Sequence, residues 1–290
     1  YNDFLRDEPG IRGSLIRMTE GPRLTLTAGG SYIDGFDFLP FASIAITVDK
    51  PGVYALLSAG YAERAPSLYE LHLRFQRAAV YSVTASNYAD AGNGDLRKEK
   101  QLVGSAMLEL GRIDNSLRLS VTGGRIKDGI DWQHNNVSDP VGGNYLLFTP
   151  DNGDVDFVDV SLQHKLTLTD LVRLRSGGAY HHLDYELTDN KPYSPDYQLF
   201  SGLELHVFWP QKIMHLFAYG EITYVSEYDG YDTESLGQEL VANIKLSFRI
   251  KDFRFHYIQQ NALMNLYEQR ESIEHPGRYI HAGITWNFTD

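Results

Sequence analysis

The sequence contains no cysteine. A disulfide framework, a thiolate zinc site and a cysteine nucleophile are therefore excluded. The sequence also lacks any run of about 18 or more apolar residues, which a transmembrane helix would require. Hydrophobic residues nevertheless make up 42% of the chain. A β-barrel is compatible with this composition, because lipid-facing and lumen-facing residues alternate along each strand and average out.

Positive charge is scarce as well. Lys and Arg number 26 against 38 Asp and Glu, which gives a formal net charge of -12. Binding to nucleic acid relies on Lys and Arg at the phosphates, so this balance argues against a nucleic-acid partner. The first residues, Tyr1 to Phe4, are neither basic nor followed by the apolar core of a signal peptide. An exported protein would therefore be present here in mature or truncated form.

Long alternating segments are abundant. Residues 278–288 place five apolar side chains on one face and mostly polar or small ones on the other: Ile280, Ala282, Ile284, Trp286 and Phe288. Residues 240–250 form the longest apolar stripe, and residues 197–209 form a similar one. A period of two with one apolar face is typical of a β-strand. Strands of ten or more residues match a tilted membrane-spanning strand, whereas soluble strands average about five or six.

Short turns and longer polar loops mostly alternate between these segments. Turns are predicted at residues 20–22, 34–35, 49–52, 112–115, 167–170, 210–212 and 251–252, and loops at residues 65–100, 133–152, 186–196, 226–235 and 268–276. Outer-membrane barrels have short periplasmic turns and longer extracellular loops. We therefore predict an all-β fold, an antiparallel transmembrane β-barrel of which about 13–14 strands are visible. A soluble β-sandwich is the alternative, and it explains neither the strand lengths nor the loop pattern.

Several motifs point to a known family. Arg64-Ala65-Pro66-Ser67 resembles a segment in the barrel of TonB-dependent outer-membrane receptors, and residues 92–100 (GNGDLRKEK) resemble its Asn-Pro-Asp-Leu-Lys-Pro-Glu-like stretch. Gly94 and Lys98 stand where prolines are usual. Residues 125–130 resemble the family's strand exit, and residues 261–267 resemble the end of its penultimate strand. With the terminal strand, the resemblance covers roughly residues 53–290.

The terminal strand also resembles the C-terminal sorting signal of outer-membrane barrels. This resemblance implies that Gly283, Trp286 and Phe288 act as an assembly signal for the barrel assembly machinery. The expected location is the bacterial outer membrane, with outer-membrane lipid around the barrel.

The family resemblance further implies a barrel of about 22 strands filled by an N-terminal plug domain. Such receptors take up scarce, bulky ligands such as ferric siderophores, cobalamin, haem or glycans, and an inner-membrane energy-coupling protein drives them. Residues 1–290 show no plug, so we expect them to be the C-terminal part of the barrel. The alternative is a complete 14-stranded passive pore whose first strand lies in residues 1–10.

The resemblance also suggests where functional residues lie. Loops and the upper lumen hold the ligand in this family, so the ligand-binding candidates are Arg64, Tyr69, His72, Arg74, Tyr81 and Tyr88. A second set lies toward the short-turn ends of inward faces and could contact a plug: Glu109, Arg118, Arg173, Arg175, Lys245, Arg249 and Arg254. Ordinary solvation of a loop and of a polar lumen wall is the alternative explanation for both sets.

No catalytic residue, metal site or cofactor is predicted. Residues 151–156 (DNGDVD) could offer oxygen ligands to calcium, but they lack the EF-hand spacing and its bidentate Glu. His181 and His182 fall on opposite faces of a strand and cannot chelate one metal together. A barrel hydrolase would need a Ser–His pair or paired acids at the rim, and no motif of such enzymes is present. A structural or assembly barrel without transport remains a third class.

Overall fold

The computed structural model describes residues 10–17, 21–72, 74–76, 88–90, 92–112, 114–139, 143–187, 194–209, 214–229, 235–265, 268–270, 273–274 and 277–286. Within these residues, 13 antiparallel strands form one continuous sheet. Its strands, in sheet order, are β1 (Gly10–Arg17), β2 (Arg23–Ile33), β3 (Asp37–Lys50), β4 (Val53–Arg64), β7 (Glu99–Arg112), β8 (Asn115–Asp139), β9 (Gly143–Thr169), β10 (Val172–Tyr185), β11 (Tyr197–Phe208), β12 (Met214–Val225), β13 (Glu239–Ile250), β14 (Phe253–Gln260) and β17 (Tyr279–Trp286).

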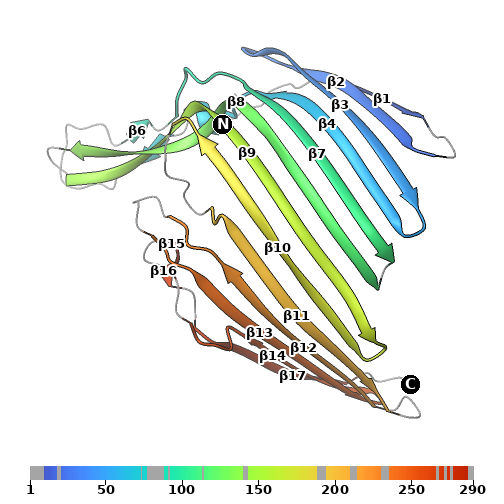
Figure 1. Ribbon diagram of the computed structural model, residues 1–290. Coiled ribbons are helices and arrows are strands. Elements are labelled where there is room, and N and C mark those ends of the chain that lie inside the picture. Colours follow the sequence, from blue (N-terminus) through green and yellow to red (C-terminus); the bar gives the residue numbers. More distant parts are fainter. Residues whose placement is uncertain are drawn as a thin grey trace.

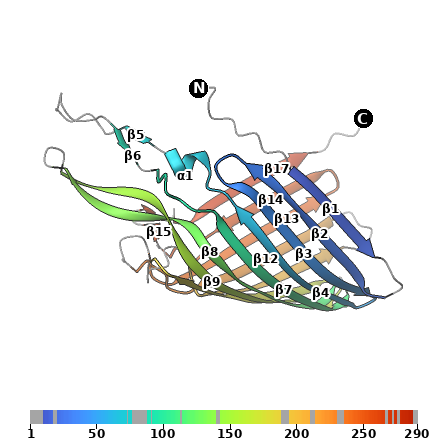
Figure 2. The ribbon, with the colours of Figure 1, turned by 90° about the horizontal axis from the view of Figure 1, so that it is seen from above.

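The sheet curves into an open trough (Figures 1 and 2). Strands β1 and β17 are its two edges, and they do not pair with each other in the described part of the chain. Tight connections gather at one end of the strands, and the long connections lie at the other end together with the short turn at residues 34–36. We call these the short-turn end and the loop end. The β8–β9 hairpin projects beyond the sheet at the loop end (Figure 1).

Cross-strand register carries the apolar stripe from strand to strand. One row of directly opposed residues runs through Leu24, Ile46, Leu57, Ala106, Val121 and Val160. Another row continues it on the far strands through Leu205, Ala218, Leu246, Tyr257 and Ala282. Opposed residues share a face of the sheet, so one face is apolar along these rows.

The other face of the sheet is polar. Ser58, Ser105, Thr122, Asp159 and His181 lie opposite one another across β4 to β10. Hydrogen bonds link neighbours in this row, including Thr122 Oγ1 to Ser105 Oγ at 3.1 Å and His181 Nδ1 with Asp159 Oδ1 at 2.6 Å. A sheet with one apolar and one hydrogen-bonded polar face matches a barrel wall between lipid and a lumen.

Strand length agrees with this interpretation. β13 has 12 residues, which at about 3.3 Å per residue spans roughly 40 Å. A tilt of about 45° reduces the height to roughly 28 Å, close to the hydrocarbon thickness of about 30 Å. The fold class predicted from the sequence is thereby confirmed. Among the described residues, no helix is both long and apolar enough to cross a membrane.

Two features of the loop end differ from the sequence prediction. Residues 133–139 and 143–152 are not a loop, because β8 and β9 continue through them as one long hairpin. Their many Asn, Asp and Gly residues hid the strands. A register shift between Ile126 and Gly129, with Asp128 at a φ of 54°, marks where the hairpin leaves the regular sheet. Such a bulge bends a strand and increases its twist.

The second difference is local structure within the predicted loops. Residues 65–100 contain a short helix, α1 (Leu68–His72), and a small hairpin of β5 (Arg74–Gln76) with β6 (Tyr88–Asp90). Residues 268–276 contain another small hairpin, β15 (Glu268–Arg270) with β16 (Ile273–Glu274). These elements are too short for a periodic pattern to reveal them.

Candidate functional site

The segment after β4 is held by a capping box at the start of α1. The backbone N–H of Glu70 donates to Ser67 Oγ at 3.2 Å, and the backbone N–H of Ser67 donates to Glu70 Oε2 at 2.6 Å. This reciprocal pair satisfies two N–H groups that a helix start leaves without partners. The preceding Pro66 is fully buried, which fixes the chain where it leaves the sheet.

Arg64 joins this helix to the sheet. Its two terminal nitrogens donate to the two carboxylate oxygens of Glu70, both at 3.1 Å, and its Nε donates to Glu99. Glu99 is buried at 6% exposure and also accepts the backbone N–H of Ile130 at 2.7 Å. A guanidinium suits this task because its planar fork can serve two carboxylates at once. We call Arg64, Glu70 and Glu99 the loop-end triad.

The charge state of Glu70 follows from these contacts. Burial acts to raise the pKa of its carboxyl, but hydrogen bonds from Arg64 and Ser67 outweigh burial and leave the pKa below its usual range. Glu70 is therefore ionised at neutral pH and remains a partner for Arg64. Acidification would weaken the pair from the carboxylate side.

The residues just before β7 dock onto the β8–β9 hairpin. Arg97 makes an ion pair with Asp128 at 2.8 Å, and its backbone N–H donates to Asn152 Oδ1 at 2.6 Å. Gly92 packs against α1 so closely that a Cβ atom there would lie 2.5 Å from the carbonyl oxygen of Leu71. The backbone N–H of Asn93 donates to the carbonyl of Glu70 at 3.0 Å. The two motifs at residues 64–67 and 92–100 thus fold into one unit.

A pocket of about 350 Å³ lies on the polar face beside this unit. Its walls come from β7 to β10 and are mainly apolar, with two carboxyl groups: Glu99, Ile126, Gly129, Ile130, Asp131, Val155, Phe157, Leu183 and Tyr185. Arg64 neutralises Glu99, whereas Asp131 has no ion pair within the described residues. Burial raises the pKa of Asp131, and a hydrogen bond from the backbone N–H of Trp132 opposes that rise. The pocket can therefore accept an apolar group with a hydrogen-bond donor or positive charge.

The ligand-binding candidates are placed differently from one another. Arg64 is committed to the loop-end triad, and Tyr69 is exposed with its ring 5.5 Å from that of Trp132. His72 ends α1 and is exposed. Arg74 and Tyr88 lie on β5 and β6, with Arg74 opposite Asp90. Tyr81 lies outside the described residues. Binding by these residues stays a prediction.

The seven lumen candidates all fall on the polar face. Glu109 and Arg118 form an ion pair at 2.6 Å, while Arg173 and Arg175 both lie 3.5 Å from the carboxylate of Glu204. Lys245, Arg249 and Arg254 lie on β13 and β14, opposite Tyr219, His215 and Thr285 respectively. Arg249 and Arg254 also oppose each other directly. Their contact with a plug is untested.

Two of the three assembly candidates lie on β17. Trp286 faces the apolar side and stacks on Phe253 with ring centroids 5.0 Å apart. Gly283 lies beneath the ring of His256, where a Cβ atom would come within 2.6 Å of the imidazole. Phe288 lies outside the described residues. Their role in assembly also stays a prediction.

No cluster of three or more metal-ligating side chains occurs among the described residues. The oxygens of residues 151–156 have other partners: Asp154 makes an ion pair with Arg125 at 2.7 Å, and Asn152 binds the Arg97 backbone. His181 faces the polar side opposite Asp159, and His182 the apolar side opposite Val158. The prediction that these histidines lie on opposite faces is confirmed.

Sequence reasoning missed Glu99, Asp131 and Trp132 as members of the site. Glu99 lay in the motif that carries the family resemblance, so its pairing with Arg64 could have been proposed there. Asp131 and Trp132 offered no such signal, because they fell in a segment whose strand pattern ends at the predicted loop.

Comparison with known proteins supports the fold. No family model matches the sequence, and no curated protein matches it at a significant level. Among solved structures, the chain is similar to a copper transporter, OprC, with a TM-score of 0.74 and 16% identity over 97% of this chain and 48% of that chain. It is similar to the ferric enterobactin receptor PfeA of Pseudomonas aeruginosa, with a TM-score of 0.64 and 17% identity over 96% of this chain and 46% of that chain.

A third similar structure is the siderophore receptor PirA of Pseudomonas aeruginosa, with a TM-score of 0.67 and 14% identity over 98% of this chain and 49% of that chain. The chain thus spans about half the length of the solved structures it matches. All three are TonB-dependent receptors. The chain has the fold of the barrel of these receptors, as the motifs predicted.

Proposed function

We propose that this chain is the C-terminal barrel part of a bacterial outer-membrane receptor that takes up a scarce, bulky ligand with energy from the inner membrane. The protein is then a transporter and not an enzyme. Support comes from the fold it shares with receptors named for copper or siderophores. The apolar outer face would contact outer-membrane lipid, and the barrel would be completed by further strands because a membrane tolerates no open sheet edge.

One observation carries the proposal furthest. The residues of the receptor-like motifs, far apart in sequence, meet in the loop-end triad beside a pocket of about 350 Å³ on the polar face. The triad fixes the wall of that pocket, since Glu99 is part of both. Loops held in place by a rigid sheet are the arrangement expected of a binding site at the mouth of a barrel.

The loop residues would complete the ligand site. We assign Tyr69, His72, Arg74, Tyr81 and Tyr88 to the ligand-facing surface, together with Asp131 in the pocket. Aromatic rings and guanidinium groups bury a flat ligand face with little loss of rotamer entropy. In this assignment, Arg64 positions the site and does not contact the ligand.

The polar face would hold a plug domain. Arg249 opposes Arg254 directly across β13 and β14. Like charges in such positions destabilise a sheet unless another group compensates them. An acidic surface on a plug would supply that compensation and would sit at the short-turn end, near the energy-coupling protein.

The C-terminal strand would direct assembly. Trp286 and Phe288 place aromatic rings near the membrane interface. In the intact protein, Trp286→Ala with Phe288→Ala should lower the yield of folded, heat-modifiable barrel made by the assembly machinery. Unchanged yield and membrane location would remove these residues from a sorting role.

The test of function is growth on a scarce ligand by cells that carry the intact gene. Uptake should be lost without the energy-coupling protein and reduced when residues 73–90 are deleted. The deletion spares the loop-end triad, so the barrel should still assemble. Uptake that persists without energy coupling would identify a passive pore instead. No ligand-dependent growth for copper, siderophores, cobalamin, haem or glycans would contradict the receptor proposal.

A further inference from the structure

A furrow of small residues crosses the apolar face of the sheet. On β1 to β3 its floor is Gly13, Ala28 and Ala42, which lie opposite one another. On β4 to β8 the floor is shifted by two residues toward the short-turn end. There it consists of Ala59, Gly104 and Gly123, which again lie directly opposite one another. The cavity over β1 to β7 measures about 710 Å³, and an adjoining one of about 510 Å³ shares Ile44 and Ala59 with it.

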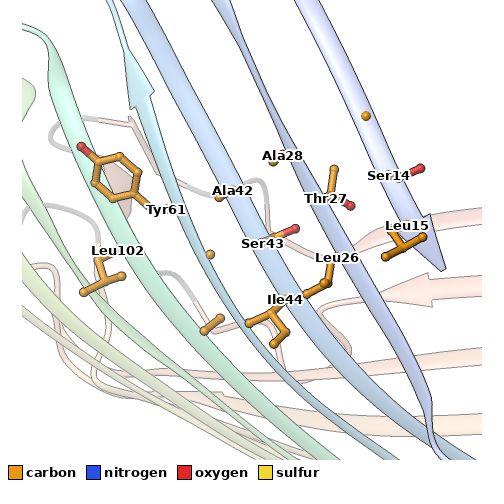
Figure 3. A pocket seen from close by; sticks show the side chains of 13 residues that line it. Ser14, Leu15, Leu26, Thr27, Ala28, Ala42, Ser43, Ile44, Tyr61 and Leu102 are labelled. Atoms are coloured by element: carbon orange, nitrogen blue, oxygen red, sulfur yellow. The ribbon is translucent and has the colours of Figure 1, made fainter. Parts of the chain in front are cut away.

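Large side chains border the furrow on both sides. Leu26 and Ile44 lie next to Ala28 and Ala42 toward the short-turn end, while Tyr61 and Leu102 lie next to Ala59 and Gly104 toward the loop end (Figure 3). The border with Tyr61 faces the loop end. A straight hydrocarbon chain in such a furrow contacts protein from three sides, so it gains more dispersion than on a flat wall.

On β4, Tyr61 lies where the outward face changes from apolar to charged residues. Its ring borders the furrow, while its hydroxyl donates to Glu63 at 2.6 Å. An aromatic ring with a polar tip is typical of the boundary between hydrocarbon and headgroups. Charged residues on the same face begin immediately above it, with Lys98 paired to Glu63 at 2.7 Å.

Two lysines above the furrow oppose each other directly. Lys100 on β7 faces Lys127 on β8, and both share the outward face with Leu102. No ion pair to either lysine occurs in the part of the chain that the structure describes, although Glu63 lies directly opposite Lys100 on β4 and Asp154 lies within electrostatic reach of Lys127. Like charges in this position are unfavourable, and they stand out in a chain of net charge -12. An anion between them would remove the repulsion.

We propose that this surface binds a phosphorylated membrane lipid from the leaflet at the loop end. Its phosphate lies between Lys100 and Lys127, and one acyl chain lies in the furrow. Hydrocarbon below and phosphate above match the order of a single lipid molecule. The inference rests on the proposed membrane location but not on ligand uptake.

The experiment measures lipid binding to the intact detergent-solubilised protein by native mass spectrometry. The probes are dimyristoylphosphatidic acid and, with the same chains but no net charge, dimyristoylphosphatidylcholine. We expect the anionic lipid to bind with a Kd about tenfold lower. Lys100→Gln with Lys127→Gln should abolish this preference, and replacement of both lysines by Arg should preserve it.

Two further variants separate the furrow from the charges. Ala42→Leu with Ala59→Leu fills the furrow and should weaken binding of both lipids, whereas Ala218→Leu on the outward face of β12 should not. Lys50→Gln with Lys251→Gln, at the short-turn end, should leave the preference intact. Equal binding of the two lipids, unchanged binding in the Gln or Leu pairs, or a protein dimer that excludes lipid would each overturn the proposal. The growth assay above decides ligand uptake separately.

Discussion

Removal of the Arg64 side chain should allow α1 to separate more often from the sheet; we call this separated state the open loop end. Among the described residues, Arg64→Ala leaves the carboxylate of Glu99, buried at 6% exposure, with the Ile130 N–H as its remaining side-chain partner, and it removes the two hydrogen bonds from Arg64 to Glu70. Breaking a buried ion pair from one side costs about 3–5 kcal/mol. The Arg64 side chain is itself 43% exposed, so solvent screening reduces the cost to about 2 kcal/mol. The open population should rise roughly 30-fold.

Hydrogen exchange measures this opening directly. The amides of Leu71, Asn93 and Ile130, which are hydrogen-bonded in the closed loop end, should exchange about 30-fold faster in Arg64→Ala. Arg64→Lys should fall between the two, because an ammonium keeps one ion pair but not the fork. The matched control is Arg118→Ala, which removes an exposed ion pair elsewhere and should leave these amides unchanged. Unchanged exchange in Arg64→Ala would refute the structural role of the triad.

Three further perturbations test other parts of the structure. Ile244→Arg places a charge on the apolar face near mid-membrane and should cost about 2–4 kcal/mol in unfolding from lipid; a variant that folds in plain buffer contradicts the membrane assignment. Gly124→Ala puts a Cβ atom 2.3 Å from a backbone oxygen and should cost about 1–3 kcal/mol, while Gly104→Ala, with 3.9 Å of room, should cost under about 1 kcal/mol. The pKa of Glu70 is lower in the folded protein than in the unfolded chain, where it is about 4.3, so ionised Glu70 stabilises the loop end above that pH. The stabilisation is lost as the pH falls through the pKa of Glu70 in the folded protein. Trp132 fluorescence should therefore change below about pH 4, and Glu70→Gln should remove that transition; the same transition in the variant would exclude Glu70 as its source.

The sheet could be predicted because each of its strands repeats a period of two over many residues. The predicted segments at residues 240–250 and 197–209 agree with β13 and β11 to within one residue at each end. In the proposed barrel, burial of one face by lipid would force strict alternation, which accounts for the strong signal along the regular part of each strand. Beyond the bulge at Ile126, neither face of the β8–β9 hairpin needs to be apolar. The alternation of apolar and polar residues that identifies a strand is therefore weak there.

The candidate site was harder to predict, because tertiary contacts decide it. The motif at residues 64–67 located the right region, but it did not show that Arg64 is bound by Glu70 and Glu99 and so serves the fold. The carboxyl of Asp131 joins the pocket only because a register shift turns the strand. No local pattern in one sequence encodes such a shift.

Because the chain has no cysteine, single introduced thiols offer the most direct test of the central claim that it spans the outer membrane with its loop end outside. His72→Cys at the loop end should react with a membrane-impermeant maleimide in intact cells. Asp252→Cys at the short-turn end should react only after the outer membrane is permeabilised, and Ile244→Cys on the apolar face should react in neither case. Equal labelling of His72→Cys and Asp252→Cys in intact cells would contradict the account, as would recovery of the labelled protein in the soluble fraction.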